Sequence, residues 1–258
     1  MNREQPETAP TQRFSTRAKY YDQYRPGYPE EIISFLKGEC GLSSSSIIAD
    51  IGSGTGILSR LFLRNGNIVF GIEPNREMRE VAEELLKEYP NFRSVNGNAE
   101  ATNLDGKRVD FATAGQAFHW FGVEKSKEEF RRILKPGGWV VLIWNDRRTD
   151  STPFLQAYEG LLINFGTDYK KVDFKNFDAG VFTSFFDKEG FNVRLFDNFQ
   201  IFDLESLKGR VNSSSYVPAE GDPKHGQMME ELSRIFFKYQ SDGKVMLEYD
   251  TKVYYGRI

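Results

Sequence analysis

The chain has 258 residues, which suits one α/β domain with additions rather than several independent domains. Its 39% hydrophobic, 14% aromatic and 28% charged residues are ordinary for a globular protein with a well-packed core. The 34 basic and 37 acidic residues give a net charge of −3, and without a basic block this composition excludes nucleic acid as an expected partner.

The N-terminal part of the chain is polar. Residues 1–12 have almost no apolar side chain, so we expect them to be mobile. No stretch approaches the roughly 18 apolar residues of a membrane span, and no signal peptide is recognisable. The single cysteine, Cys40, cannot form an internal disulfide, and no Cys/His cluster has metal-site spacing. These features predict a cytoplasmic protein with no membrane partner and no metal.

From residue 47 to residue 150, short apolar runs alternate with stretches of helical periodicity. This alternation predicts a parallel sheet whose strands are joined by helices. We expect strands at residues 47–51, 68–73, 92–95, 109–114 and 139–144. Helices are expected at residues 57–64, 75–88 and 125–134, and the turn Lys135-Pro136-Gly137-Gly138 should end the last of them.

After residue 145 the pattern changes to Phe-rich amphipathic segments. Those at residues 154–165, 180–188, 205–211 and 228–239 predict a helical cover. Two alternating runs, at residues 192–202 and 244–254, predict two further strands. A short connection such as Ser241-Asp242-Gly243 favours antiparallel pairing of these strands at one edge of the sheet.

A glycine-rich turn joins the first strand to the first helix, in the run Asp50-Ile51-Gly52-Ser53-Gly54-Thr55-Gly56. Glycine permits positive φ and lets a ligand approach bare backbone, while a helix N-terminus offers unpaired N–H groups to an anion. These properties indicate a nucleotide-type site. The glycine spacing is G-x-G-x-G, whereas a dinucleotide fingerprint is G-x-G-x-x-G, which disfavours an NAD-dependent oxidoreductase.

Glu73 ends the second predicted strand, 21 residues after Gly52 (73 − 52). A carboxylate at this place can accept both hydroxyls of an adenosine ribose. The alternative is that Glu73 only caps the helix that begins near Asn75.

The run D-I-G-S-G-T-G followed by G-I-E-P-N resembles motif I and the acidic partner of class I S-adenosylmethionine-dependent methyltransferases. The segments Asn98-Ala99-Glu100, Phe118-His119-Trp120-Phe121 and Leu134-Lys135-Pro136-Gly137-Gly138 resemble the type-11 methyltransferase group, and the second recurs in relatives of trans-aconitate methyltransferase. The resemblance implies a Rossmann-like, seven-stranded, mostly parallel sheet of order 3-2-1-4-5-7-6. Its last strand is antiparallel, with helices on both faces and a helical cover.

The resemblance also implies one domain over residues 13–258. Residues 13–40 would form N-terminal lid helices, residues 45–150 the cofactor-binding core, and residues 151–258 the substrate-side cover with the two closing strands.

The same resemblance assigns S-adenosyl-L-methionine as the cofactor. The methionine end would lie on the glycine turn, the ribose on Glu73, the adenine face on two apolar residues, and the adenine edge on the segment after the third strand. Asn98 stands where the family usually has Asp. The implied cofactor residues are Asp50, Gly52, Ser53, Gly54, Gly56, Glu73, Pro74, Met78, Asn98, Ala99, Glu100 and Gln116.

The substrate side is assigned to Tyr21, Arg25, His119, Trp120 and Tyr216. Tyr21 and Arg25 lie in the segment that resembles a lid; alternatively, the tyrosine only packs and the arginine is a solvated charge. His119 is a candidate general base, or a wall of the pocket, because an unperturbed imidazole titrates near neutral pH. Tyr216 could close the acceptor pocket or belong to a polar turn.

The predicted activity is methyl transfer from S-adenosylmethionine to a small-molecule acceptor, as O-methylation of a small carboxylic acid or a hydroxyl compound. A non-catalytic, S-adenosylmethionine-binding regulatory protein and an NAD-dependent oxidoreductase remain alternatives. The place of a nucleic-acid methyltransferase motif, Asn/Asp-Pro-Pro-aromatic, is taken by Gly115-Gln116-Ala117-Phe118. We expect a monomer or a homodimer.

Overall fold

The computed structural model describes residues 22–167, 169, 179–186, 190–214 and 216–258. The expectation of a mobile segment at residues 1–12 and the assignment of Tyr21 lie outside these residues. The described chain contains one seven-stranded sheet of order β3-β2-β1-β4-β5-β7-β6, which confirms the expected order. The strands are β1 (Ile47–Ile51), β2 (Ile68–Ile72), β3 (Phe92–Val95), β4 (Val109–Gly115), β5 (Leu134–Arg147), β6 (Phe191–Phe202) and β7 (Val245–Gly256).

The first five strands are parallel, and β7 runs antiparallel to both of its neighbours, β5 and β6. Strand β1 is central and almost fully buried, as its unbroken run of apolar residues predicts. The carboxyl ends of β1 and β4 therefore lie side by side, and the chain reverses there into the glycine turn and into Gln116. Open α/β sheets bind ligands at this edge.

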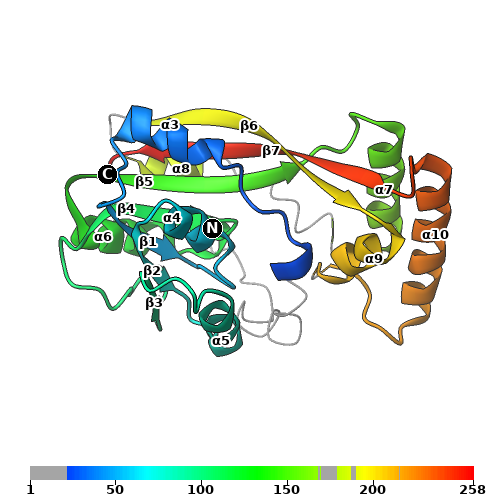
Figure 1. Cartoon of the computed structure of the whole chain (residues 1–258), viewed down its shortest axis with the longest axis horizontal. Coiled ribbons are helices and arrows are strands. Elements are labelled where there is room, and N and C mark those ends of the chain that lie inside the picture. Colours follow the sequence, from blue (N-terminus) through cyan, green and yellow to red (C-terminus); the bar gives the residue numbers. More distant parts are fainter. Residues whose placement is uncertain (1–21, 168, 170–178, 187–189, 215) are drawn as a thin grey trace.

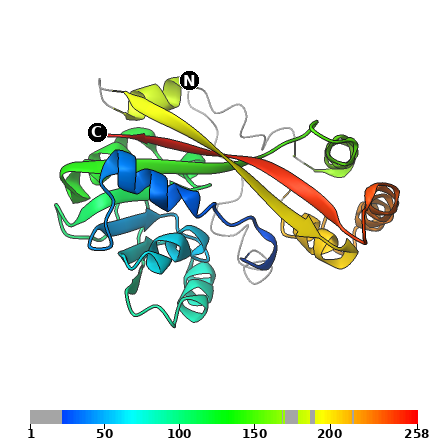
Figure 2. The same cartoon turned by 45° about the horizontal axis from the view of Figure 1, so that its top comes forward.

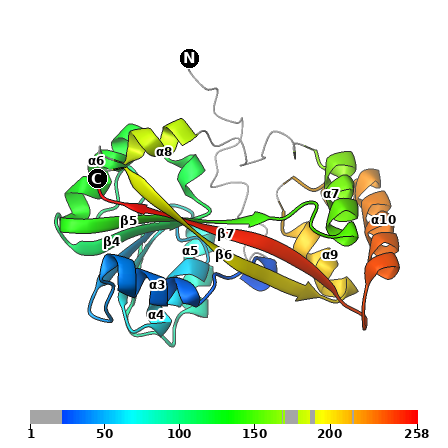
Figure 3. The ribbon, with the colours of Figure 1, turned by 90° about the horizontal axis from the view of Figure 1, so that it is seen from above.

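Helices cover both faces of the sheet (Figure 3). Helix α3 (Glu31–Cys40) and helix α4 (Ile57–Arg64) lie on one face, where Ile32, Leu36 and Phe62 pack against Ile48. Helix α6 (Val123–Ile133) and helix α8 (Ala179–Phe185) lie on the other face. Helix α5 (Arg76–Leu85) begins at Asn75, whose side chain accepts a hydrogen bond from the N–H of Met78 and caps the helix.

A separate lobe stands at the far end of the long strands (Figures 1 and 2). Helices α7 (Pro153–Phe165), α9 (Leu204–Asn212) and α10 (Pro223–Tyr239) form it around their own apolar cluster. Strands β6 and β7 pair along their whole length and carry this lobe away from the parallel core. We refer to these three helices as the lobe.

Two expectations about the second half of the chain need correction. Helix α8 does not join the lobe, because Phe182 and Phe185 pack on the sheet against Phe118. The turn at Ser241–Lys244 connects α10 to β7, and both α9 and α10 lie between β6 and β7 in the chain. The antiparallel pair is therefore closed by the lobe rather than by a tight hairpin.

Strand β5 is longer than the expected residues 139–144. It begins at Leu134, and its register against β4 shifts between Val109 and Phe111, so that Lys135-Pro136-Gly137-Gly138 forms an irregularity inside the strand. At its other end β5 continues to Arg147 because β7 pairs with it as far as Tyr249. Three polar residues, Asn145 to Arg147, are thereby held on a strand.

In the described part of the chain, no helix has the length and hydrophobicity needed to cross a bilayer. The same residues contain no group of three or more His, Cys, Asp and Glu side chains that could hold a metal ion.

Candidate active site

The glycine turn has the backbone shape that its sequence predicts. Gly52, Gly54 and Gly56 all have positive φ, at 69°, 55° and 86°. A Cβ at Gly52 would lie 2.6 Å from the Cβ of Ala117, whereas a Cβ at Gly54 would have no atom within 4 Å. Gly52 is thus required by packing as well as by φ, while Gly54 faces open space where a ligand can reach the backbone.

Most N–H groups of the turn already have acceptors in the protein. The N–H groups of Gly52 and Ser53 donate to the carbonyl of Ile72, at 2.8 and 3.1 Å, and that of Gly54 donates to Glu73 Oε2 at 3.0 Å. Within the turn, the groups left for an anion are those of Thr55 and of the first turn of α4, which has no preceding carbonyls to use. The anion-binding donors therefore lie slightly later in the chain than expected.

Glu73 connects the glycine turn to helix α5. Its second oxygen accepts a hydrogen bond from the N–H of Asn75 at 2.9 Å, and the side chain is 9% exposed. Burial raises the pKa of the carboxyl group, although the N–H donors of Asn75 and Gly54 oppose that shift. Glu73 thus holds the start of α5 and also the glycine turn, and each of its oxygens keeps a lone pair for a hydroxyl.

Asp50 is fully buried at the end of β1 and lines the pocket described below. Its Oδ2 accepts a hydrogen bond from Ser59 Oγ at 2.6 Å, while its Oδ1 has no hydrogen-bond partner in the described chain. Burial raises the pKa of the carboxyl group to about 7, with a smaller contribution from the charge of Glu73. A buried oxygen without a donor is one to which a ligand group can donate.

One pocket extends from the glycine turn to the lobe. Of the cofactor and substrate residues expected from the sequence, it brings together Arg25, Asp50, Gly52, Ser53, Gly54, Gln116 and Tyr216. Its other lining residues are Pro26, Tyr28, Thr55, Ile57, Leu58, Gly115, Asn145, Asp146, Arg147, Thr149, Tyr169, Arg210 and Tyr249. Residues of the glycine turn and of β4 form one end of this pocket, and residues of β5, β7 and the lobe form its opposite wall.

Residues 22–29 lie between the core and the lobe (Figure 1, dark blue). Arg25 donates from Nη2 to the carbonyl of Ser213 at 2.9 Å, which fixes this segment to the end of α9. Gln200 and Asn198 of β6 donate to the carbonyls of Tyr24 and Gly27, at 3.3 and 2.9 Å. The segment therefore closes one side of the pocket, and Arg25 is part of its wall rather than a solvated charge.

Gln116 joins the ends of β4 and β5. Its Oε1 accepts from the N–H of Asn145 at 3.2 Å, and its Nε2 donates to the carbonyl of the same residue at 3.4 Å. Its φ of 56° is rare for a residue other than glycine and marks a strained turn at the pocket. Gln116 thus lines the expected region while its amide group extends the sheet ladder.

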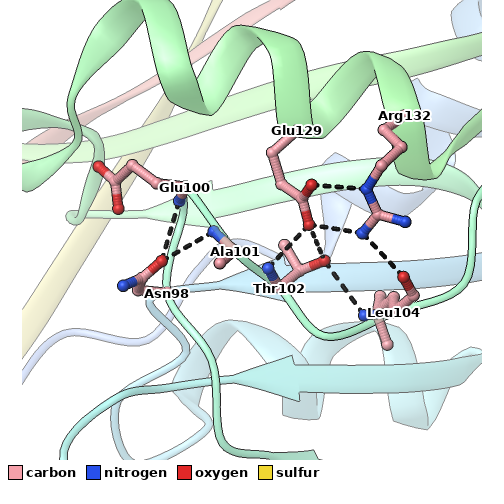
Figure 4. A network of polar contacts seen from close by, with 7 residues as sticks. All are labelled: Asn98, Glu100, Ala101, Thr102, Leu104, Glu129 and Arg132. Carbon is pink, nitrogen blue, oxygen red and sulfur yellow. Dashed lines mark hydrogen bonds and ion pairs between the residues drawn. The ribbon is translucent and has the colours of Figure 1, made fainter.

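The segment after β3 is a tight turn that Figure 4 shows from close by. Asn98 Oδ1 accepts from the N–H groups of Glu100 and Ala101, at 3.1 and 2.8 Å, so the outward-facing group of its amide is the NH2 donor. Glu100 is turned away from Asn98, and its Oε1 accepts from the N–H of Gly122 at 2.6 Å, before helix α6. Ala99 is buried in the core.

Pro74 is exposed, Met78 is buried within α5, and Gly56 has no place in the pocket wall because a Cβ there would meet Leu86. The structure thus places Gly56, Glu73, Pro74, Met78, Asn98, Ala99 and Glu100 outside the pocket lining. Their assignment to the cofactor stays a prediction.

His119 and Trp120 form a short 3-10 helix, Phe118–Trp120, after β4. Their rings are 4.6 Å apart and tilted by 49°, and neither residue lines the pocket. Burial lowers the pKa of His119 to about 3, so its imidazole is neutral at physiological pH and a weak proton acceptor. This environment disfavours His119 as the general base, and its position outside the pocket lining does not support its expected role as a pocket wall either.

The basic and aromatic wall of the pocket was not predicted from the sequence. It is formed by Arg147, Arg210, Tyr169 and Tyr249. A signal for Arg210 was available, because it falls on the apolar face of α9 with Leu207 and Val211. Arg147 could not be placed from local sequence, because it belongs to β5 only through the pairing of that strand with β7.

The chain was compared with known proteins. A model described as a methyltransferase domain matches residues 49–142, which run from β1 into β5. An uncharacterized methyltransferase-like protein of Schizosaccharomyces pombe is 28% identical over 248 residues, covering 93% of each chain. An uncharacterized methyltransferase of the same organism is 29% identical and covers 90% of this chain and 91% of the relative.

A solved structure from Anaeromyxobacter dehalogenans, described as a type II methyltransferase, superposes with a TM-score of 0.68 at 20% identity, covering 91% of this chain and 98% of that one. At this identity the likeness shows the fold. The strand order, the glycine turn with its buried Asp50, the matched domain and the named relatives together support a class I S-adenosylmethionine-dependent methyltransferase.

Proposed function

We propose that the protein O-methylates a small carboxylic acid or hydroxyl compound that binds between the glycine turn and the lobe. One observation carries the proposal: a single pocket has the glycine turn at one end and Arg25, Arg147 and Arg210 at the other. A basic wall favours an anionic acceptor. No metal or catalytic cysteine is needed for this chemistry.

The residues present fit S-adenosylmethionine, which supplies a methyl group on a cationic sulfur. Asp50 offers an unpartnered buried oxygen to the amino group, Thr55 and the first turn of α4 offer donors to the carboxylate, and Gly54 leaves bare backbone beside them. Thr55 Oγ1 is also buried without a partner in the described chain, so its hydroxyl group is available to donate to the ligand.

Methyl transfer forms a bond from an acceptor oxygen to the methyl carbon and breaks the carbon–sulfur bond, whose electron pair neutralises the sulfur. A carboxylate acceptor is ionised at neutral pH and has no proton to lose, so positioning supplies most of the acceleration. A hydroxyl acceptor needs a base. The low pKa of His119 therefore favours the carboxylate within this proposal.

The test is methyl transfer from labelled S-adenosylmethionine to a panel of small acids and phenols. A methyl ester loses its label as methanol in mild alkali, whereas a methyl ether keeps it. We expect alkali-labile product from at least one acid. Labelled product only from amines, or only from macromolecules, would contradict the proposal.

A further inference from the structure

Arg210 is a buried positive charge in the pocket wall. It lies on α9 between the apolar residues Leu207 and Val211, and it is 6% exposed. Its Nη1 donates to Ser214 Oγ at 3.0 Å, and it also bonds the hydroxyl group of Tyr249. Its Nε is buried without a hydrogen-bond partner in the described chain. Both groups that it contacts are neutral.

Arg147 lines the same wall and provides a comparison. Its guanidinium forms an ion pair with Glu159, bonds the hydroxyl group of Tyr169 at 3.0 Å, and lies 5.0 Å from the centre of the Tyr158 ring. Arg210 has no such carboxylate partner within the residues that the structure describes. A buried charge is retained at a cost unless a partner compensates it, and a ligand is a suitable partner.

The neighbours of Arg210 confirm that this end of the pocket is positive. Burial alone would raise the pKa of Tyr216, yet the charges of Arg210, Arg25 and Arg147 hold that pKa below its usual value. The other groups that face Arg210 are the tyrosines Tyr158 and Tyr249, so none of its neighbours in the described chain is a carboxylate. The acidic residues that line the pocket are Asp146, which pairs with Lys252 at 2.6 Å, and Asp50 beside the glycine turn.

We propose that Arg210 is the anchor for a carboxylate of the methyl acceptor, so that the acceptor is an organic acid and the carboxylate completes the charge balance of the wall. This inference rests on the proposed function and makes it more specific. The guanidinium fork can bind the two oxygens of a carboxylate together. An amide or ester of the same acid is neutral and cannot replace it.

Ligand binding gives the first test. Wild-type protein and Arg210→Met, both saturated with S-adenosylhomocysteine, are titrated by calorimetry with benzoate, phenylacetate, succinate and 4-hydroxybenzoate, and with the corresponding amides. We expect at least one acid to bind the wild type about 10- to 100-fold more tightly than its amide. In Arg210→Met this preference should disappear, while the affinity for S-adenosylhomocysteine stays within about twofold.

Stability without any ligand gives the second test, with Arg147→Met as the matched control. Removing Arg147 leaves Glu159 without its ion-pair partner, so we expect a lower Tm. Removing Arg210 relieves an uncompensated charge, so Arg210→Met should melt at or above the wild-type Tm. A merely structural Arg210 would instead lower Tm as much as Arg147 does.

Three results would overturn the inference. The first is a preference for acids that survives in Arg210→Met, or is absent from the wild type. The second is a fall of tenfold or more in S-adenosylhomocysteine affinity in Arg210→Met, which would assign the arginine to the cofactor carboxylate. The third is a loss of Tm equal to that of Arg147→Met. If the wild type does not bind S-adenosylhomocysteine at all, the proposed function itself fails.

Discussion

At the scale of single residues, Asp50 should make cofactor binding depend on pH. Its pKa of about 7 means that half of the ligand-free protein carries the neutral acid at that pH. If the ionised form binds the cofactor's ammonium group, the affinity for S-adenosylhomocysteine should fall about tenfold from pH 8 to pH 6. Calorimetry across this range measures the slope.

The controls for Asp50 are two variants. Asp50→Asn should bind weakly at every pH and lose the slope. Asp146→Asn removes another pocket carboxylate, one that Lys252 already pairs, and should keep the slope. A flat profile in the wild type would contradict the role of Asp50. Because burial raises its pKa above the unfolded value of 3.8, the contribution of Asp50 to stability falls as pH rises from about 4 to 7.

Comparing alanine substitutions at Gly54 and Gly41 distinguishes the cost of backbone strain from the loss of ligand access. Gly54 and Gly41 both have positive φ, at 55° and 68°, and a Cβ would meet nothing within 4 Å at either position. Alanine should therefore cost each site a similar stability, about 1 kcal/mol. Only Gly54→Ala should weaken S-adenosylhomocysteine binding, by tenfold or more, because only Gly54 faces the pocket. Equal affinities of the two variants would show that the ligand does not contact this backbone.

At the scale of secondary-structure elements, α6 positions the turn that follows β3 (Figure 4). Glu129 is 8% exposed and accepts from Thr102 N and Thr102 Oγ1, at 2.8 and 2.5 Å. Arg132 donates to both oxygens of Glu129 and to the carbonyl of Leu104. Although burial opposes ionisation, these donors lower the pKa of Glu129. The stability it contributes is therefore present above its unfolded pKa and lost as pH falls below about 4.

Glu129→Ala should lower the free energy of unfolding by about 1 to 3 kcal/mol, since it leaves Thr102 N and Arg132 without their acceptor. Because the turn carries Asn98, adenosine-containing ligands should also bind more weakly. Denaturant unfolding and calorimetry measure the two effects. Glu128→Ala, at an exposed position of the same helix, should change neither. Equal losses in both variants would exclude a specific role for this network.

Local patterns predicted most of these elements. The apolar run of β1, the glycine turn and the cap of α5 each depend on residues close together in the chain, so their positions follow from short-range geometry. The length of β5 does not follow from short-range geometry, because Asn145 to Arg147 belong to a strand only through β7, about 100 residues later. The placement of α8 depended likewise on which surface its phenylalanines meet.

At the scale of the whole molecule, the sheet forms the glycine-turn end of the pocket and the lobe forms its opposite end. Motifs that are contiguous in sequence predicted the glycine-turn end, and Asp50, Gly52, Ser53, Gly54 and Gln116 do line the pocket there. The acceptor wall instead combines β5, α9 and β7, whose residues Arg147, Arg210 and Tyr249 share no local pattern. Residue spacing alone cannot predict a wall that is assembled from distant segments. An arginine on the apolar face of a predicted helix, such as Arg210, nevertheless indicates that the residue is buried for a specific reason.

The identity of the adenosine-containing ligand that binds this pocket is the most direct test of the methyltransferase assignment. Calorimetric titration of the wild-type protein with S-adenosylhomocysteine and with NAD, under identical conditions, decides it. We predict micromolar or tighter binding of S-adenosylhomocysteine, about −8 kcal/mol or more favourable, and no detectable binding of NAD. Binding of NAD without binding of S-adenosylhomocysteine would contradict the assignment of this protein as an S-adenosylmethionine-dependent methyltransferase.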